Sequence, residues 1–517
     1  MKLLHGRPLL WPALAGLAQA ASIALPGSGQ AHGWLQVLSL AILANGLMRI
    51  ASWGAPVALG VRRAAWFSGV FATFWLGGSF WWLYVSMHDV GGLPAPLAAL
   101  AVLALASAVS LFYAAAAAAW VALSTSVSPQ SRPWFSSVLF AAVWTLAELM
   151  RGQWFTGFPW GAGGYAHVDG VLSVWAPWVG VYGLGFVAAL LAMRLALTGW
   201  RLAAIRPLAL VGLLSWAVQA WSPAFTVSAG SGQVELLQAN ITQNEKFDVR
   251  SGIRDALQWY DERLRASQQA LVVAPETAIP LLRQYLPEGY WPGLQKHFAQ
   301  PDRPLALVGV PLGSQTLGYA NAVVALGPEG QTDYRYDKHH LVPFGEFIPP
   351  GFGWFVRQMQ IPLGDFSSGR ADQPSITWQG QRLSPNICYE DLFGEELAAR
   401  FKDGAKAPTV LVNVSNIAWF GNTLAVDQHL NISRMRAMEL GRPMLRATNT
   451  GATAIIDHQG RVTQQLPRFT RGTLVGSYEG RTGLTPYARW AAAWGLLPLW
   501  GLCGVIVLIG AVRRRLA

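Results

Sequence analysis

Three short stretches in the middle of the chain each place a reactive side chain beside an apolar run. Glu276 follows the apolar run 272–275, and Cys388 ends another such run. Lys338 and Glu346 lie between them in a loop-like stretch. A deprotonated thiol is a strong nucleophile, a carboxylate can accept and return its proton, and an ammonium group can stabilise an oxyanion. Together these side chains could form and break a thioester.

The assignment of Cys388 as a nucleophile depends on the other two motifs, because a single cysteine is more often a small buried apolar residue than a nucleophile. The chain has two cysteines, and Cys503 lies in an apolar segment near the C-terminus, so we expect no disulfide between them. His339 and His340 lack the further ligands that a zinc site requires. No glycine-rich phosphate-binding motif follows a strand, and we expect neither a metal nor a cofactor.

The scaffold that positions these side chains is predicted from alternating β-branched and amphipathic stretches. Strands are expected at 234–241, 271–275, 305–310, 322–326, 384–389, 409–414, 444–449, 453–457 and 473–478. Helices are expected at about 249–268, 283–299, 392–403 and 426–441. Several strand runs are apolar throughout, as in sheets that are covered on both faces. The pattern predicts an α/β layered sandwich.

The whole chain is more apolar than a soluble protein. Of its 517 residues, 52% are hydrophobic and 13% are charged, whereas soluble proteins carry about 25% charged residues. Eight apolar segments are candidates to span a membrane, at about 8–25, 34–52, 64–87, 95–124, 134–150, 171–195, 203–221 and 490–511. We therefore predict three regions, namely a seven-helix membrane region (1–222), an α/β catalytic domain (223–489) and a C-terminal membrane helix with a basic tail (490–517).

The basic residues predict the orientation of these segments, because Lys and Arg are retained on the cytoplasmic side. With the N-terminus inside, most basic residues of the connections and tail fall in the cytoplasm: Lys2, Arg7, Arg62, Arg63, Arg132, Arg201, Arg206, Arg513, Arg514 and Arg515. Residues 223–489 then lie outside the cytoplasm. This topology explains the net charge of +11 better than a nucleic-acid-binding patch does. A cleaved signal peptide in the first segment is the alternative, and it leaves the domain on the same side.

Glu148 and Arg151 are two ionisable residues near the end of a predicted membrane helix, three positions apart. Ionisable residues at membrane depth often mark a functional site. An internal ion pair that stabilises the helix bundle is an equally good interpretation.

The motifs around these residues resemble those of the nitrilase, or carbon–nitrogen hydrolase, superfamily, which has a Glu–Lys–Cys triad. Within it, they are most similar to the apolipoprotein N-acyltransferase family. The similar stretches extend over nearly the whole chain, in order: 82–89, 156–160, 275–278, 338–349, 387–390, 419–421, 446–451 and 484–487.

The resemblance implies an αββα sandwich combined with eight membrane helices, and a two-step acyl transfer in the biosynthesis of lipoproteins. It assigns Glu276 as general base, Lys338 as oxyanion stabiliser and Cys388 as nucleophile, with Glu346 orienting the lysine. Tyr389, Glu390, Phe247 and Trp419 match substrate-handling positions. The acyl donor would be a phospholipid, phosphatidylethanolamine, and the acceptor the α-amine of an apolipoprotein's S-diacylglyceryl cysteine. The resemblance also implies a monomer in a bacterial inner membrane with a periplasmic catalytic domain.

Two positions depart from the family pattern. Phe247 replaces a tryptophan, which keeps an aromatic ring but removes the indole N–H donor. Ile417 replaces an acidic residue before Trp419. Neither position belongs to the triad, so these departures bear on substrate handling rather than on the type of reaction.

The stretch after Glu346 is rich in apolar residues and is punctuated by glycine and proline: Phe347, Ile348, Pro349, Pro350, Phe352, Trp354, Phe355 and Met359. Apolar residues exposed beside a membrane favour insertion into the lipid interface or a ligand groove. We expect a lid that admits acyl chains, and an ordinary packed loop is the alternative.

Two other functions share parts of this pattern. A membrane-tethered amidase would use the same triad but hydrolyse its thioester with water. A transporter or scaffold would instead call for paired broken helices or several charges near the membrane midplane, and Glu148 is the one convincing residue of that kind.

Overall fold

The structure is a computed structural model that describes residues 10–52, 56–124, 131–199, 205–246, 248, 251–314, 316, 318–328, 333–356 and 366–516. The chain divides into two compact units. The helical unit contains Met1–Trp81, Pro96–Pro223 and Leu496–Ala517, and the α/β unit contains Trp82–Ala95 and Ala224–Gly495.

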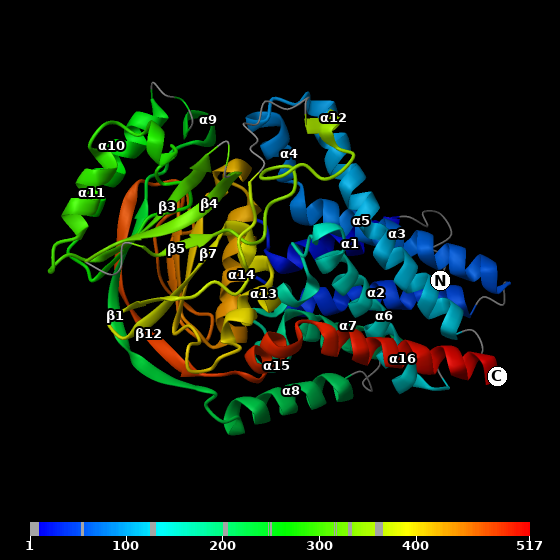
Figure 1. Ribbon diagram of the computed structural model, residues 1–517. Coiled ribbons are helices and arrows are strands. Elements are labelled where there is room, and N and C mark those ends of the chain that lie inside the picture. The colour runs from blue at the N-terminus through cyan, green and yellow to red at the C-terminus, as the bar shows by residue number, and fades with distance from the viewer. Residues whose placement is uncertain are drawn as a thin grey trace. The chain divides into compact units, whose positions relative to one another are not determined.

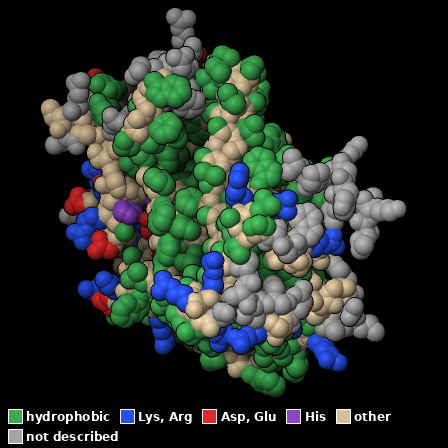
Figure 2. Space-filling view, turned by 90° about the vertical axis from the view of Figure 1, so that its right-hand side faces the viewer, with side chains coloured by type: hydrophobic (Ala, Val, Ile, Leu, Met, Phe, Trp, Pro, Cys, Tyr) green, Lys and Arg blue, Asp and Glu red, His purple; other side chains and the backbone are tan. Residues whose placement is uncertain are grey.

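Apolar helices make up the helical unit (Figure 1). They are α1 (Leu10–Ile23), α2 (Gly33–Ala51), α3 (Val57–Phe80), α5 (Ala95–Ser124), α6 (Pro133–Gln153), α7 (Ala176–Thr198), α8 (Ile205–Trp221) and α16 (Leu497–Leu516). Within the described residues, five helical segments are long and apolar enough to cross a membrane: Gly33–Ala51, Ala95–Ser124, Pro133–Thr156, Val171–Thr198 and Leu497–Leu516. Hydrophobic side chains cover much of the molecular face in Figure 2. The predicted apolar helical region is therefore present.

A segment with little regular helix, buried over residues 159–168, connects α6 to α7. It passes through short turns at η3 (Trp154–Thr156), η4 (Gly163–His167) and η5 (Val171–Trp175). Arg151 Nη1 donates to the carbonyl oxygens of Phe158 and Trp160, both at 2.7 Å, and Glu148 Oε1 accepts from the backbone N–H of Gly163 at 3.1 Å. Irregular backbone among apolar helices needs such partners. Both ionisable side chains thus stabilise this connection.

Two six-stranded sheets form the centre of the α/β unit. The first has the order β12-β1-β2-β3-β4-β5 and the second the order β11-β10-β9-β8-β7-β6. The first sheet contains β1 (Thr226–Gln238), β2 (Leu271–Val273), β3 (Leu305–Ser314), β4 (Gly318–Leu326), β5 (Arg335–Asp337) and β12 (Gly472–Gly483). The second contains β6 (Ile376–Trp378), β7 (Gln381–Ile387), β8 (Val410–Ser415), β9 (Met444–Thr448), β10 (Ala454–Ile456) and β11 (Val462–Gln465). In each sheet the three central strands run parallel, as β1-β2-β3 and β7-β8-β9.

Three apolar cores show how these sheets are layered. The core between the sheets joins Leu236, Val273 and Leu307 to Ile387, Val412 and Leu445. The outer face of the first sheet packs against α10 (Gly252–Ala266) and α11 (Tyr290–Phe298). The outer face of the second packs against α13 (Gly394–Ala398), α14 (Leu424–Leu440) and α15 (Pro486–Trp494). The α/β unit is therefore the expected αββα sandwich (Figure 1).

Several element boundaries differ from the sequence predictions. The three- and four-residue strands β5, β6 and β11 were not predicted. The apolar segment 490–511 is two helices, α15 and α16, because the chain turns at Gly495 with φ 56°. The segment expected at 64–87 is also wrong at its end, since α3 stops at Phe80.

The chain after α3 continues through the short helix α4 (Leu83–Val85) and the π-helix η2 (Ser86–Val90). This stretch packs within the α/β unit rather than extending α3. The indole N–H of Trp82 donates to Gln428 Oε1 at 3.0 Å, and the Trp82 ring lies 4.2 Å from that of Phe420. A specific polar partner explains why an apolar sequence leaves the helix here.

Candidate active site

Glu276 lies in the turn that follows β2, and its carboxylate accepts hydrogen bonds on both oxygens. Asn321 Nδ2 donates to Oε1 at 2.7 Å, and the backbone N–H of Asn416 donates to Oε2 at 2.8 Å. The next residue, Thr277, has φ 48°, in the left-handed region that side chains seldom adopt. The turn therefore holds the carboxylate in one place, with donors that favour its ionised form.

Lys338 directly follows β5 and is buried between two carboxylates. Its Nζ lies 3.4 Å from Glu276 Oε1 and 2.9 Å from each oxygen of Glu346. Asn321 Nδ2 also donates to Glu346 Oε1, at 2.8 Å, and the backbone N–H of Val342 donates to Oε2 at 2.8 Å. Three of the four predicted catalytic residues are thus joined in one hydrogen-bonded cluster.

Cys388 begins the turn after β7 and has φ 52°. Burial, together with the charge of Glu276, raises the pKa of its thiol to about 12, against the opposing effects of Lys338 and of a hydrogen bond with Ser415. The thiol is therefore protonated at neutral pH and needs a base to become a nucleophile. Because Glu276, Lys338 and Glu346 all act on this pKa, the thiol lies within electrostatic range of the cluster that those three side chains form.

The charges in the cluster stabilise one another. Burial acts to raise the pKa of Glu276, but Lys338, Asn321, Lys246 and Asn416 outweigh it and hold that pKa below its usual value. Burial acts to lower the pKa of Lys338, but Glu346 and Glu276 raise it above its usual value. The resting site therefore contains an ionised base, an ammonium group and a neutral thiol.

A buried polar network that the sequence did not predict supports the turn at Cys388. His429 Nε2 lies 2.8 Å from Asp391 Oδ1 and 3.2 Å from the carbonyl oxygen of Cys388. Arg446 Nη2 lies 2.7 Å from His429 Nδ1, and since guanidinium can only donate, the imidazole is neutral with its proton on Nε2. Burial and the charge of Arg446 lower the pKa of His429 accordingly. The imidazole Nε2–H thus acts as a fixed donor to Asp391 and to the backbone carbonyl of Cys388.

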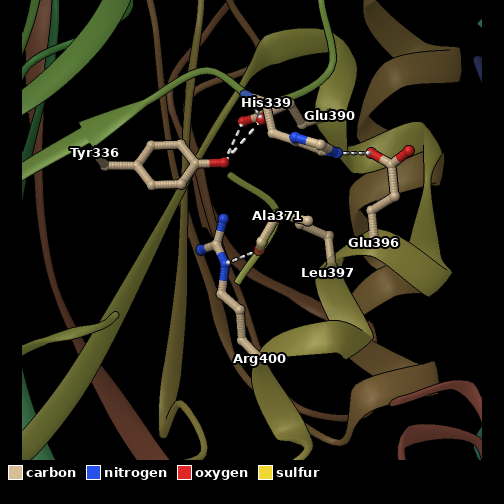
Figure 3. A pocket seen from close by; sticks show the side chains of 7 residues that line it. All are labelled: Tyr336, His339, Ala371, Glu390, Glu396, Leu397 and Arg400. Atoms are coloured by element: carbon tan, nitrogen blue, oxygen red, sulfur yellow. Dashed lines mark hydrogen bonds and ion pairs between the residues drawn. The ribbon is translucent and has the colours of Figure 1, made fainter. Parts of the chain in front are cut away.

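Glu390 connects the Lys338 loop to the strand that carries Cys388. Its carboxylate accepts from Tyr336 OH at 2.8 Å, from the backbone N–H of His339 at 2.6 Å and from that of Ile387 at 2.5 Å. Figure 3 shows the Tyr336 hydroxyl directed at this carboxylate. Burial raises the pKa of Glu390, while Arg400 and these donors lower it. Glu390 thus links the residue after Lys338 to the residue before Cys388.

A small cavity of about 10 Å³ borders Glu390, with room for about one water molecule. Its lining is shown in Figure 3 and consists of Tyr336, His339, Ala371, Glu390, Glu396, Leu397 and Arg400. Neither Cys388 nor Lys338 contributes to this lining, so the cavity lies behind the reactive cluster and is not the substrate site.

Besides Glu390, the residues predicted to handle substrate are Tyr389, Trp419 and Phe247. Tyr389 is buried, with its ring 5.3 Å from that of Phe393 and 5.6 Å from that of His340. Trp419 is half-buried in the turn η10 (Ile417–Phe420), which follows Asn416. Phe247 lies outside the described residues. Within the part of the chain that is described, no three His, Cys, Asp or Glu side chains are grouped to hold a metal ion.

We expect a Glu390→Gln substitution to loosen the site. Oε1 accepts from the backbone N–H groups of His339 and His340, and Oε2 from that of Ile387. The NH₂ group of the amide therefore leaves at least one buried donor without its acceptor, whichever way it faces. We predict a destabilisation of about 2 kcal/mol and a loss of roughly 10- to 100-fold in the rate of Cys388 acylation, because Lys338 shifts. Thermal unfolding and intact-protein mass spectrometry measure the two effects.

The matched control is Tyr336→Phe, which removes one hydroxyl donor and leaves the backbone N–H groups of His339, His340 and Ile387 on the carboxylate. It should cost about 1 kcal/mol and leave the acylation rate within about threefold. Equal acylation rates in wild type and the glutamine variant would contradict the linking role of Glu390.

Curated relatives identify the family. The chain is 55% identical to the apolipoprotein N-acyltransferase of Verminephrobacter eiseniae over 94% of this chain and 93% of that protein. The chain belongs to the apolipoprotein N-acyltransferase family. Proteins of the same name are 45% identical in Ralstonia nicotianae, over 93% of this chain and 89% of that protein, and 41% identical in Bordetella bronchiseptica, over 97% and 96%.

Two family models match separate parts of the chain. The model of the carbon–nitrogen hydrolase family matches residues 233–487, and the model of the apolipoprotein N-acyltransferase N-terminal domain matches residues 24–194. The resemblance seen in the sequence is confirmed, and the chain is an enzyme of the acyltransferase class with a nitrilase-like α/β domain.

Proposed function

We propose that this chain moves an acyl group from a phospholipid, phosphatidylethanolamine, to the α-amine of an apolipoprotein's N-terminal S-diacylglyceryl cysteine, through a thioester on Cys388. This reaction would complete lipoprotein maturation. The observation that carries the proposal is the meeting of a neutral thiol, an ionised carboxylate and an ammonium group in one buried cluster.

The first half-reaction forms the thioester. Glu276 takes the proton of the Cys388 thiol as the sulfur attacks the ester carbonyl of the phospholipid. Lys338, together with the backbone N–H after the nucleophile, stabilises the negative oxygen of the tetrahedral intermediate. The intermediate collapses, the C–O bond breaks, and the lysophospholipid oxygen takes the proton back from Glu276.

The second half-reaction transfers the acyl group to nitrogen. The neutral α-amine of the acceptor attacks the thioester carbonyl, and Glu276 accepts the proton that the nitrogen loses. The C–S bond breaks, the thiolate recovers that proton, and an amide is released. Glu346 orients Lys338 in both steps through the contacts at 2.9 Å.

Residues 1–222 and 490–517 are proposed to provide eight membrane-spanning helices, with residues 223–489 on the periplasmic side of a bacterial inner membrane. The five apolar helices among the described residues and the positions of the arginines support this topology. A monomer is sufficient, because every residue of the reactive cluster belongs to one α/β unit.

The loop after Glu346 is proposed to admit the acyl chains. Phe344 and Phe352 pack edge to face with centroids 5.3 Å apart, and Phe352 and Trp354 are 45% and 61% exposed. Exposed aromatic rings of this kind favour a lipid interface. Phe355 and Met359, which were predicted to share this role, lie outside the side chains that the structure describes.

Replacing Phe352 and Trp354 together with serine should slow acylation of Cys388 by phospholipid about tenfold, because the loop loses its affinity for the lipid interface. Intact-protein mass spectrometry over time measures the rate. Tyr285→Ser, at a ring of the α/β unit that is 68% exposed, is the matched control and should have no effect. An unchanged rate in the double variant would rule out the lid.

The direct test of the function is the mass of the Cys388 peptide after incubation with phosphatidylethanolamine, with and without a diacylated lipopeptide. We expect the peptide to gain one acyl group with the phospholipid alone and to lose it only when the lipopeptide amine is present. Loss of the acyl group to water at the same rate without lipopeptide would indicate an amidase, and absence of any adduct would refute the thioester.

A further inference from the structure

A second buried lysine lies beside the reactive cluster, and the two half-reactions above give it no part. Lys246 ends the short helix α9 (Gln243–Lys246) and is 3% exposed. Its Nζ donates to the carbonyl oxygen of Glu276 at 3.2 Å and to Thr277 Oγ1 at 2.5 Å. Lys246 therefore holds the turn at Glu276 and Thr277, which positions the proposed general base.

The helix that carries Lys246 is bound to the same turn by a separate contact. Asn416 Nδ2 donates to Gln243 Oε1 at 2.8 Å, while the backbone N–H of Asn416 donates to the Glu276 carboxylate. Gly252, at the start of α10, lies so close that a Cβ would meet the carbonyl oxygen of Glu245 at 1.9 Å. The position of α9 is thus built into the unit, and the ammonium group is held where it is.

The number of carboxylates in the site explains why a second buried lysine is needed. Two carboxylates, Glu276 and Glu346, face Lys338, Lys246 and the Cys388 thiol in a buried site. Arg446, on β9 of the sheet that also carries Cys388, interacts with the thiol, but it also contacts Asp391 at 3.4 Å. Without Lys246, two carboxylates would share one ammonium group, and a buried pair of that kind keeps one proton. The ammonium group of Lys246 supplies the second positive charge that the two carboxylates would otherwise lack.

We propose that Lys246 is a positioning residue that serves, beside Lys338, as the second counter-cation of the active site and stabilises the carboxylate of Glu276. Glu276 can then accept the Cys388 proton in the first half-reaction and the amine proton in the second. The inference rests on the proposed function and extends it to a residue outside the Glu–Lys–Cys triad.

The ionisation of Lys246 itself limits the effect to a pH range. Burial lowers its pKa to about 8, against the opposing charges of Glu276 and Cys388. Its ammonium group is therefore present at neutral pH and is lost as the pH rises above about 8. The influence of Lys246 on the thiol should be largest near pH 7 and should fade in more basic solution.

The test compares the pH dependence of Cys388 alkylation by iodoacetamide in the purified full-length chain in detergent micelles. Lys246→Gln keeps a hydrogen-bond donor but removes the charge, and Lys246→Arg keeps the charge. For Lys246→Gln we expect the alkylation rate at pH 7 to fall at least about tenfold. The rise of the alkylation rate with pH should shift by about one pH unit toward higher pH. Lys246→Arg should stay within about threefold of wild type at every pH.

Lys296→Met, which removes an exposed lysine of the same unit, controls for a general effect of charge. Lys246→Met repeats the loss of charge without a donor and should match the glutamine variant. Wild-type behaviour of Lys246→Gln would overturn the proposal. So would an equal loss of rate at every pH in the glutamine and arginine variants, because that pattern indicates a structural role alone.

Alkylation requires no phospholipid, so this result is independent of the acyl-transfer chemistry. If wild type alkylates normally but never forms an acyl-enzyme, the proposed function fails while the counter-cation is still tested. If wild type forms the acyl-enzyme and the Lys246→Gln profile is unshifted, the counter-cation alone fails.

Discussion

A Cys388→Ala variant is expected to form no acyl-enzyme with phospholipid and to lose at least about 10⁴-fold in N-acylation of a diacylated lipopeptide. The remaining side chains can bind and polarise an ester, but none of them replaces the sulfur as the group that carries the acyl chain. Intact-protein mass spectrometry follows the first step, and mass spectrometry of the lipopeptide follows the second.

Cys503→Ala is the matched control, because Cys503 is the second cysteine of the chain and is buried in α16 of the helical unit. It should keep full activity and the same acyl adduct. Residual N-acylation in Cys388→Ala at more than a hundredth of the wild-type rate would show that acyl transfer proceeds without a thioester.

The second large effect is expected for Lys338→Met. Lys338 is 1% exposed, and its removal leaves the carboxylates of Glu276 and Glu346 close together without their shared cation. Breaking a buried ion pair in this way costs about 3–5 kcal/mol, and loss of an oxyanion-stabilising group costs about 10²- to 10³-fold in rate. We therefore predict both a lower thermal midpoint and slow acylation of Cys388.

The pH dependence separates these two effects. A proton on either carboxylate replaces part of the missing positive charge, so the folded variant binds protons more tightly than wild type does. The gap in stability between Lys338→Met and wild type should therefore narrow as the pH is lowered. Thermal unfolding at several pH values measures this gap.

The double variant Lys338→Met/Glu346→Gln provides the control. It removes one carboxylate together with the ammonium group, so most of the lost stability should return while acylation stays slow. Recovery of the acylation rate in the double variant would show that Lys338 merely balances charge and does not act on the oxyanion.

Sequence alone predicted the candidate catalytic residues better than the residues that hold them in place. Glu276 and Cys388 each follow an apolar run, Lys338 lies in a loop-like stretch, and all three belong to recognisable motifs. The structure places them together. Asn321 lies within an apolar strand, and its two contacts, with Glu276 and Glu346, depend on a strand pairing that sequence does not reveal. Lys246 is a similar case, because a buried lysine in a four-residue helix has no local pattern.

The fold was predicted at the level of its layers and less well at its edges. Strands with continuous apolar character were anticipated, even the three-residue strands β2 and β10, whereas β5, β6 and β11 are both short and interrupted by polar residues. Apolar composition also continued without interruption past Phe80 and across Gly495. In both places the chain changes direction for a local reason, the hydrogen bond of Trp82 and the positive φ of the glycine, that hydropathy does not measure.

The irregular connection between α6 and α7 has a consequence for biogenesis. Its carbonyl and amide groups depend on Arg151 and Glu148, both carried by α6, so it cannot enter lipid alone with these groups unpaired. We expect α6, the connection and α7 to leave the insertion machinery as one preassembled hairpin. Arg151 would then pair the backbone carbonyl groups of this connection during membrane insertion, before the protein binds any substrate.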